Sequence, residues 1–350
     1  MTPPNGWLIL DKPVGLGSTQ AVAAVKRNLR EAGYGKVKTG HGGTLDPLAS
    51  GELPIALGEA TKLAGRMLDS DKVYEFTVAF GAETDTLDLE GKIVAESDVR
   101  PTLAQVEAVL ARFTGAIEQV PPAYSALMID GQRAYDLARA GEEVVLKSRG
   151  VTIYALTISS PLAGEESEAC LRSGLAQLGE GAEVARGLAP SPTSPSEQAR
   201  KASYPPPQEG RRESITLTAH VSKGTYIRSL ARDIARALGT VGHLTHLRRT
   251  RAGPFTLDTA ISLDMLNEIG NGARLENTLL PLEAGLDGIP ALDLGPDQAR
   301  AVHQGRVLTG LAFQDGVCWA RYGDRPLALM QVDGGNATVL RGFNLHDTAE

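Results

Sequence analysis

The chain has 350 residues, 42% of them hydrophobic and 22% charged, with a formal net charge of −7 at pH 7. This composition is typical of a globular protein, and the length allows one large domain and a smaller one. Its two cysteines, Cys170 and Cys318, are far apart, which argues against a disulfide framework or a zinc site and fits a reduced, cytoplasmic setting. No apolar signal region and no run of about 18 apolar residues is found, so we expect no membrane span.

The first half of the chain predicts strands and helices in alternation. Residues 7–10 form a short apolar run before Asp-Lys-Pro, which is typical of a strand followed by a turn. A helix is expected to begin with Ser18 or Thr19 as its N-cap and to end near Gly33. Apolar periodicity then predicts a strand over 73–80, a helix over about 102–113 and a strand over 151–158.

The second half begins with a segment that lacks periodicity, between about 161 and 213. Its Pro, Ser, Glu, Gly and Gln content predicts a flexible insertion. An alternating strand follows from Ile215 to Ser222, and then a helix with a stripe of arginines spaced four residues apart. The stripe consists of Arg228, Arg232 and Arg236. Glycine and proline near 285–296 predict a boundary between a domain over 1–285 and a small, mostly β domain over 286–350.

Charge is distributed unevenly along this half. Between Lys223 and Arg251 there are seven Lys or Arg residues and one acid, Asp233, so the stretch carries a charge of +6. A local basic surface on an acidic protein is compatible with nucleic-acid binding, because the contact patch matters more than the total charge.

The segment Gly40–Gly51 has the composition of a rigid loop that presents reactive side chains. Its glycines allow tight turns and close backbone approach, and Pro47 biases the preceding Asp46 to an extended conformation. The loop therefore presents one carboxylate, Asp46, and one imidazole, His41, as a functional site on a loop would. Taken singly, each has a simpler explanation as a turn residue or an ordinary loop histidine.

Two other motifs imitate ligand-binding sites. Gly15–Gln20 follows a strand and opens a helix like a dinucleotide fingerprint, but Gln20 stands where a third glycine or an alanine is needed. Asp85 and Asp88 could suggest calcium, but the loop pattern of a calcium site is missing, so a turn is the better interpretation. Spacing alone therefore leaves a two-domain enzyme of unknown substrate.

The loop Gly40–Gly51 is one of several motifs in a recognisable order. The others are Leu10–Gly15, Lys72-Val73-Tyr74, Pro121–Ala126, Gly131–Arg139, Ser222–Leu230 and Leu247-Arg248-Arg249. Together they resemble the bacterial tRNA pseudouridine-55 synthases, the TruB family, over about residues 6–158 and 214–255. Two positions depart from that pattern: Gly17 replaces the first serine of the Ser-Ser signature, and Met128 replaces a common lysine.

The resemblance implies an α+β fold, with a large, mainly antiparallel sheet, flanking helices and a small β-rich C-terminal domain of the PUA type. It also implies isomerisation of uridine to pseudouridine at position 55, in the T loop of tRNA. The tRNA T stem-loop is therefore the expected partner. We expect a monomer that uses neither a cofactor nor a metal. The alternative is a tRNA-binding or tRNA-folding factor with secondary catalysis, which would not need the Asp46 carboxylate.

The resemblance also assigns roles to individual residues. Asp46 matches the family's essential aspartate, which attacks covalently or drives glycal formation, and the sequence leaves both routes open. Arg228 matches the arginine that pairs with it and orients it. Tyr74 matches the tyrosine that stacks on the target base and is placed to handle a proton. The other expected substrate contacts are His41 at the flipped nucleotide, Tyr226 and Leu247 in the uracil pocket, Asp88, and Lys12, which supports the loop or touches substrate.

Phosphate contacts are expected from the arginine stripe and from the arginines of the last motif, because extracting a base from its stack costs a few kcal/mol. The expected phosphate ligands are Arg232, Arg236, Arg248 and Arg249, with Arg251 beside them.

Overall fold

The computed structural model describes residues 3–125, 127–129, 131–142, 144–159 and 211–345. Its centre is a nine-stranded sheet in the order β1-β3-β12-β4-β11-β10-β7, with β2 beside β3 and β13 beside β12. All paired neighbours are antiparallel except β3 and β12, which are parallel. The strands are β1 Gly6–Lys12, β2 Thr39–His41, β3 Ser50–Leu57, β4 Lys72–Phe80, β7 Gly115–Gln119, β10 Arg149–Ile158, β11 Ser214–Val221, β12 Gly242–Ala252 and β13 Phe255–Thr256.

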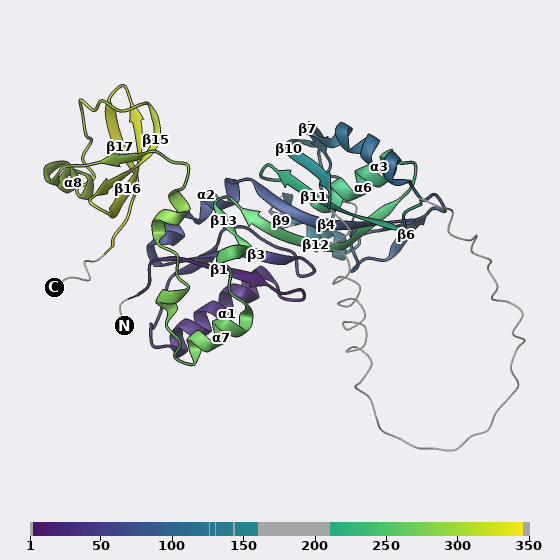
Figure 1. The fold of residues 1–350 in the computed structure, drawn as a ribbon, viewed down its shortest axis with the longest axis horizontal. Coiled ribbons are helices and arrows are strands. Elements are labelled where there is room, and N and C mark those ends of the chain that lie inside the picture. The colour runs from purple at the N-terminus through teal and green to yellow at the C-terminus, as the bar shows by residue number, and fades with distance from the viewer. Residues whose placement is uncertain (1–2, 126, 130, 143, 160–210, 346–350) are drawn as a thin grey trace, which may run out of the picture.

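Helices cover this sheet in two groups (Figure 1). Helices α1 (Ser18–Glu31) and α7 (Leu263–Gly270) lie side by side against β1 and β3, and α3 (Leu103–Leu110) and α6 (Ile227–Ala237) pack at the other end of the sheet. Each group covers its own apolar core, and Tyr74 and Leu247 contact both of these cores. A third core, which includes Trp7 and Ile9, lies on the other face of β1 and β3. The junction between the two groups is therefore where a cleft can form.

Short elements connect the main ones. They are η1 Gly58–Leu63, α2 Ala64–Asp69, β5 Ala82–Thr84, β6 Ile93–Glu96, η2 Ala111–Phe113, β8 Met128–Ile129, β9 Gln132–Arg133, α4 Ala134–Arg139, η4 Leu257–Thr259, η5 Leu275–Asn277 and η6 Leu282–Leu286. Strands β5 and β6 pair with each other, as do β8 and β9, so each pair forms a small two-stranded sheet beside the main one.

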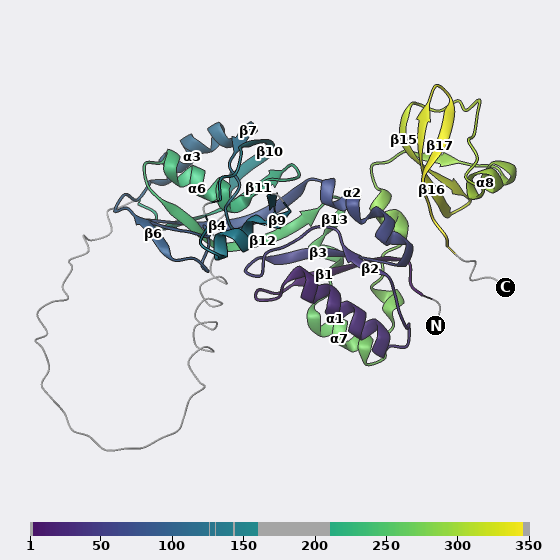
Figure 2. The same ribbon diagram turned by 180° about the vertical axis from the view of Figure 1, so that it is seen from behind.

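The C-terminal part forms a small β-rich unit at one end of the molecule, which is seen from both sides in Figures 1 and 2. Strands β14 (Ala291–Asp293), β15 (Gly316–Tyr322), β16 (Arg325–Asp333) and β17 (Asn336–Gly342) form one sheet in that order, and α8 (Pro296–His303) packs against it. Its own core is separate from the cores of the large sheet, while Phe343, just after β17, belongs to the third of those cores.

Most predicted elements are confirmed in position and type. The strand over 73–80 corresponds to β4, in which Phe76, Val78 and Phe80 are buried on one face and Tyr74 is half-buried. The helix over 102–113 is α3 followed by η2, and the mainly antiparallel sheet confirms the α+β class and excludes the dinucleotide fold. The predicted insertion over 161–213 lies outside the described residues, except for 211–213.

The predicted start of α1 is wrong in its capping residue. Gly17, not Ser18 or Thr19, is the N-cap, and its amide donates to the side chain of Gln20. The Ser18 hydroxyl instead makes two hydrogen bonds to the backbone of Leu45, one as donor and one as acceptor. Ser18 therefore fastens the Gly40–Gly51 loop to α1. None of the helices in the described ranges is long and apolar enough to cross a membrane.

Candidate active site

Asp46 lies in the loop between β2 and β3, at the junction of the two helix groups. Its carbonyl oxygen accepts a hydrogen bond from Ala49 at 3.0 Å, so the segment turns tightly around the aspartate. The carbonyl oxygen of Pro47 accepts another from Gly15 at 2.8 Å. With the bonds between Ser18 and Leu45, the loop is fastened on both sides of Asp46 to the region where β1 passes into α1.

Lys12 is the second fastening of this loop. Its ammonium donates to the carbonyl oxygens of Leu16 at 2.7 Å, Pro13 at 2.9 Å and Pro47 at 3.4 Å. Burial lowers the pKa of Lys12 to about 8, although the charge of Asp46 acts in the opposite direction. Because Lys12 is fully buried, the predicted support of the loop fits the structure and the predicted contact with substrate does not.

Arg228 contacts the Asp46 carboxylate from the protein interior. One guanidinium nitrogen lies 2.9 Å from Asp46 Oδ2 and also donates to the carbonyl oxygen of Tyr124 at 3.0 Å. The other lies 3.4 Å from Asp88 Oδ2 and donates to the carbonyl oxygen of Thr86 at 3.0 Å. The Arg228 side chain is 8% exposed and that of Asp46 is 46% exposed. A buried, fully engaged guanidinium therefore fixes a carboxylate whose other face is open.

Asp88 belongs to a compact turn between β5 and β6. Its carboxylate accepts hydrogen bonds from the Thr86 hydroxyl at 2.5 Å and the Glu90 amide at 3.1 Å. Leu87, just before it, has a positive φ of 64°, a conformation that costs a non-glycine residue about 1–2 kcal/mol. The turn interpretation is confirmed, and Asp88 orients Arg228 from the side opposite Asp46.

Two adjoining hollows open at Asp46. The smaller is lined by Leu244, Leu247 and Leu89, and the larger by Tyr124, Ser125 and several charged side chains. Asp46, Leu48, Asp88 and Arg228 line both. The predicted contact residue Leu247 thus lies where an apolar part of a ligand would meet the carboxylate.

The other predicted contact residues lie around this centre. His41 ends β2, and its Nδ1 is buried without a hydrogen-bond partner among the described residues. Burial, helped by the charge of Arg249, lowers the pKa of His41 below its usual value, so its imidazole is mainly neutral at pH 7. The guanidinium carbon of Arg149 lies over the Tyr226 ring, 4.7 Å from the ring centre. Tyr226 does not line either hollow.

Comparison with known proteins shows the family to which the chain belongs. Two family models match, the TruB family pseudouridylate synthase (N terminal domain) over residues 29–169 and the tRNA pseudouridylate synthase B C-terminal domain over 228–287. The chain is 62% identical to the tRNA pseudouridine synthase B of Novosphingobium aromaticivorans, with 99% of each chain covered. It is 52% identical to that of Zymomonas mobilis, with 97% of this chain and 96% of the relative covered. The chain belongs to the TruB family of pseudouridine synthases.

A solved structure of an H/ACA ribonucleoprotein bound to a substrate RNA containing 2′-deoxyuridine has the same fold. The TM-score is 0.64 at 23% identity, and the alignment covers 98% of this chain and 86% of that one. Both the predicted family and the predicted fold class are therefore confirmed.

In this TruB-family chain the arginines predicted to contact phosphate are each paired with a carboxylate. Arg249 is 1% exposed and lies against Glu52, so the prediction of a phosphate contact is wrong for this residue. Arg232 is 13% exposed, paired with Asp233 and bonded to the carbonyl oxygen of Val120, so its contact with phosphate stays a prediction. The remaining pairs are Arg236 with Glu83, Arg248 with Asp11 and Arg251 with Asp71.

The predicted basic stripe on α6 is consequently neutralised. Its spacing along the helix is as predicted, and Arg232 is paired with its neighbour Asp233 on the same helix. The acids that face Arg228 and Arg236 come from other elements and could not be read from the local sequence. The cations that line the larger hollow were missed instead: Lys92, Arg133 and Arg139, all exposed. Arg133 and Arg139 lie in the Gly131–Arg139 motif of the resemblance, which was the available signal.

Proposed function

We propose that this chain converts uridine to pseudouridine at position 55 in the T loop of tRNA. The observation that carries the proposal is the contact between Asp46 and Arg228 at the meeting point of the two hollows, in a chain of the TruB family. Relatives that cover almost the whole chain are named tRNA pseudouridine synthase B.

The reaction breaks the bond between C1′ and N1 of the target uridine, turns the base, and joins C1′ to C5, which then loses its proton. Asp46 has an open face toward the hollows, so its carboxylate can attack C1′ or stabilise the positive charge that develops on the sugar. The two routes are the covalent and the glycal route, and the contacts around Asp46 serve both. Arg228 supplies orientation: it spans Asp46 and Asp88, so the carboxylate does not need to reorganise during the reaction.

The target base must leave its stack to reach Asp46, which costs a few kcal/mol. Stacking on an aromatic ring returns about 1–3 kcal/mol per base. We assign this role to Tyr74 on β4, which, like Leu247, contacts both of the cores beneath the helix groups. Lys92, Arg133 and Arg139 line the larger hollow and are placed to receive the phosphates that flank the flipped nucleotide.

We further assign residues 1–285 to the catalytic domain and 286–350 to an RNA-binding domain of the PUA type. The separate core of β14–β17 and α8 supports this division. The C-terminal unit would extend the contact with tRNA beyond the T loop.

Replacement of Asp46 by asparagine tests the proposal. Asp46→Asn keeps the size and polarity of the side chain and removes the nucleophile. Pseudouridine in a T stem-loop RNA, detected by mass spectrometry after single-turnover incubation, should fall below detection while RNA binding changes little. The matched control is Asp264→Asn at an exposed position in the first turn of α7, which should react at the wild-type rate. Normal conversion by Asp46→Asn would refute the assignment. If the unmutated protein bound the RNA but formed no pseudouridine, a tRNA-binding or tRNA-folding factor would be favoured.

A further inference from the structure

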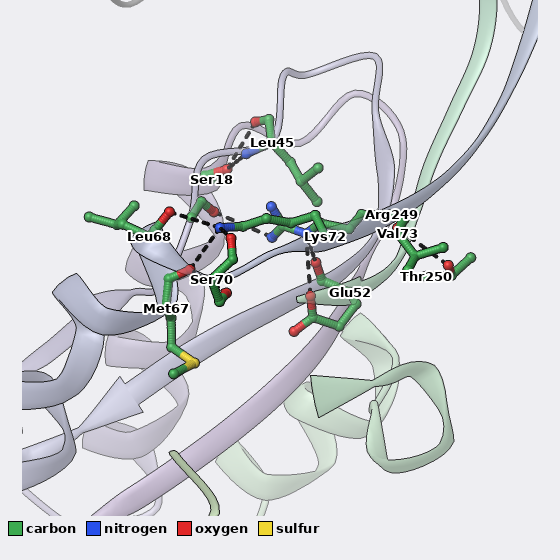
Figure 3. Close-up of polar contacts among 11 residues, drawn as sticks. Ser18, Leu45, Glu52, Met67, Leu68, Ser70, Lys72, Val73, Arg249 and Thr250 are labelled. Carbon is green, nitrogen blue, oxygen red and sulfur yellow. Dashed lines mark hydrogen bonds and ion pairs between the residues drawn. The ribbon is translucent and has the colours of Figure 1, made fainter. Parts of the chain in front are cut away.

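A carboxylate lies fully buried beneath the loop that carries Asp46. Glu52 is on β3, opposite Asp11 of β1, and has 0% exposed area. Figure 3 shows its side chain beside Arg249, with the Lys72 ammonium reaching the carbonyl oxygens of Met67, Leu68 and Ser70 nearby. An acidic side chain is rarely buried to this extent unless a partner compensates its charge.

The compensation of Glu52 is incomplete. Arg249 Nε lies 3.3 Å from Glu52 Oε2, but its hydrogen atom is directed at the Glu52 carbonyl oxygen, 2.8 Å away. Neither carboxylate oxygen has a hydrogen-bond partner among the described residues. The carboxylate thus receives the charge of Arg249 without the hydrogen bonds that usually accompany a buried ion pair. The charged groups that act on Glu52 are Arg249 on β12 and Lys72 on β4, and Asp11 lies opposite it on β1. The other charged or titratable groups on the surrounding strands are Lys12 on β1, His41 on β2, Tyr74 and Glu75 on β4, and His243, His246, Arg248 and Arg251 on β12.

Arg249 in turn touches the catalytic loop. Its Nη2 donates to the carbonyl oxygen of Gly43 at 3.4 Å, three residues before Asp46. A Cβ atom on Gly43 would lie 3.2 Å from Arg249 Nη1, and one on Gly51 would lie 2.1 Å from the Arg249 carbonyl oxygen. Arg249 also stands opposite Tyr74 in the register of β12 and β4. Arg249 therefore connects the loop of Asp46, which its guanidinium contacts, to the strand of Tyr74, with which its backbone is paired.

We propose that Glu52 is a positioning residue for pseudouridine formation, whose ionised carboxylate holds Arg249 against Gly43 and so fixes the loop of Asp46 relative to Tyr74. Glu52 acts through Arg249 and does not touch RNA. The inference rests on the proposed function, since positioning is measured through that reaction.

The ionisation of Glu52 connects this role to pH. Burial raises the pKa of Glu52 to about 7, although the charges of Arg249 and Lys72 act to lower it. The folded protein therefore binds a proton here that the unfolded chain, with a pKa near 4.5, has released. The contribution of Glu52 to stability is greatest below pH 4.5 and is lost as pH rises through 7. The ionised form needed for positioning is therefore the form that is less favourable for the fold.

Replacement of Glu52 by glutamine separates a positioning role from a merely structural one. Glu52→Gln has nearly the same volume and resembles the protonated acid. The single-turnover rate of pseudouridine formation by the wild type should rise with pH through about 7. In Glu52→Gln that rise should be absent, the rate at pH 8 should be about 10-fold lower, and RNA affinity should be unchanged. The melting temperature at pH 8 should be equal to or above that of the wild type. A loss of activity accompanied by an equal loss of stability would overturn the proposal.

Controls keep the outcomes distinct. Glu59→Gln, on η1 directly after β3, removes a carboxylate that pairs with Lys62 outside the site, and should keep both the rate and its pH dependence. If Glu52→Gln does not fold, Glu52→Asp should keep the rise near pH 7 with a lower plateau, and a flat profile would contradict the proposal. If Glu52→Gln kept the wild-type rate and pH dependence, the role of Glu52 would be overturned, but the proposed function would not. An inactive wild type would instead refute the proposed function.

Discussion

Two arginine–carboxylate pairs lie on either side of the same loop, and they differ in solvent access. In the pair of Arg228 and Asp46, the arginine is buried and both of its terminal nitrogens are hydrogen-bonded, while the carboxylate is 46% exposed. In the pair of Arg249 and Glu52, the side chains are 1% and 0% exposed, and the carboxylate accepts no hydrogen bond from any described residue. The carboxylate of Asp46 is therefore accessible to a ligand, whereas the carboxylate of Glu52 is not.

The comparison shows how similar residue pairs can serve reaction and positioning. A carboxylate that must react needs one free face and a partner that does not move. A buried pair with poor hydrogen bonding is costly to the fold, because removing charges from water is only partly repaid by their attraction. Such a pair is understandable where it fixes something else, here the Gly43 end of the catalytic loop.

The largest effect is expected at the pair of Arg228 and Asp46, and it concerns the reaction rate. Arg228→Lys keeps the charge but loses the planar fork that spans Asp46, Asp88 and two carbonyl oxygens. We expect the single-turnover rate to fall about 10³-fold with little change in RNA affinity. Rapid-quench kinetics and a binding titration measure the two quantities. A rate within a few-fold of the wild type would mean that Asp46 does not depend on a rigid partner.

An intermediate effect is expected where the buried pair meets the backbone. Gly51 has a φ of 103°, and a Cβ atom there would meet the carbonyl oxygen of Arg249. Gly51→Ala should lower the free energy of unfolding by about 3 kcal/mol, because conformational strain and a steric clash add. Gly33→Ala is the matched control: its φ is 89° but a Cβ atom would meet nothing within 4 Å, so about 1 kcal/mol is expected. Equal losses in urea unfolding would show that the contact with Arg249 has no energetic weight.

The smallest effect is expected at the rim of the larger hollow. Arg139→Ala should weaken RNA binding a few-fold and reduce the slope of log affinity against log salt by about 1, since one phosphate contact is lost. Arg236→Ala, whose guanidinium is paired with Glu83, should leave that slope nearly unchanged. If Arg236→Ala reduced the slope and Arg139→Ala did not, the phosphate contacts would be assigned to the arginines of α6 instead.

Local periodicity was sufficient to predict β4, α3 and α6, because each element buries one apolar face. The link between Asp46 and Arg228 came from resemblance, since the two residues lie on elements far apart in sequence and no local pattern joins them. The fate of the arginines could not be predicted for a related reason. Asp11 and Glu52 reach their partners through the order of the strands in the sheet, and Glu83 on β5 reaches Arg236 through the packing of α6. The charge of +6 counted from Lys223 to Arg251 therefore overstates the net positive charge at the surface of the folded protein.

The parallel pairing of β3 with β12 has a consequence for how the enzyme becomes active. It brings Glu52 and Arg249 together across 197 positions of sequence, and contacts of this separation form slowly because a long loop must close first. A growing chain that has completed β1–β4 already contains Asp46 and Tyr74, but not the arginines that orient and brace the loop. Catalytic competence should therefore appear only in the last stage of folding, after α6 and β12 have joined the sheet.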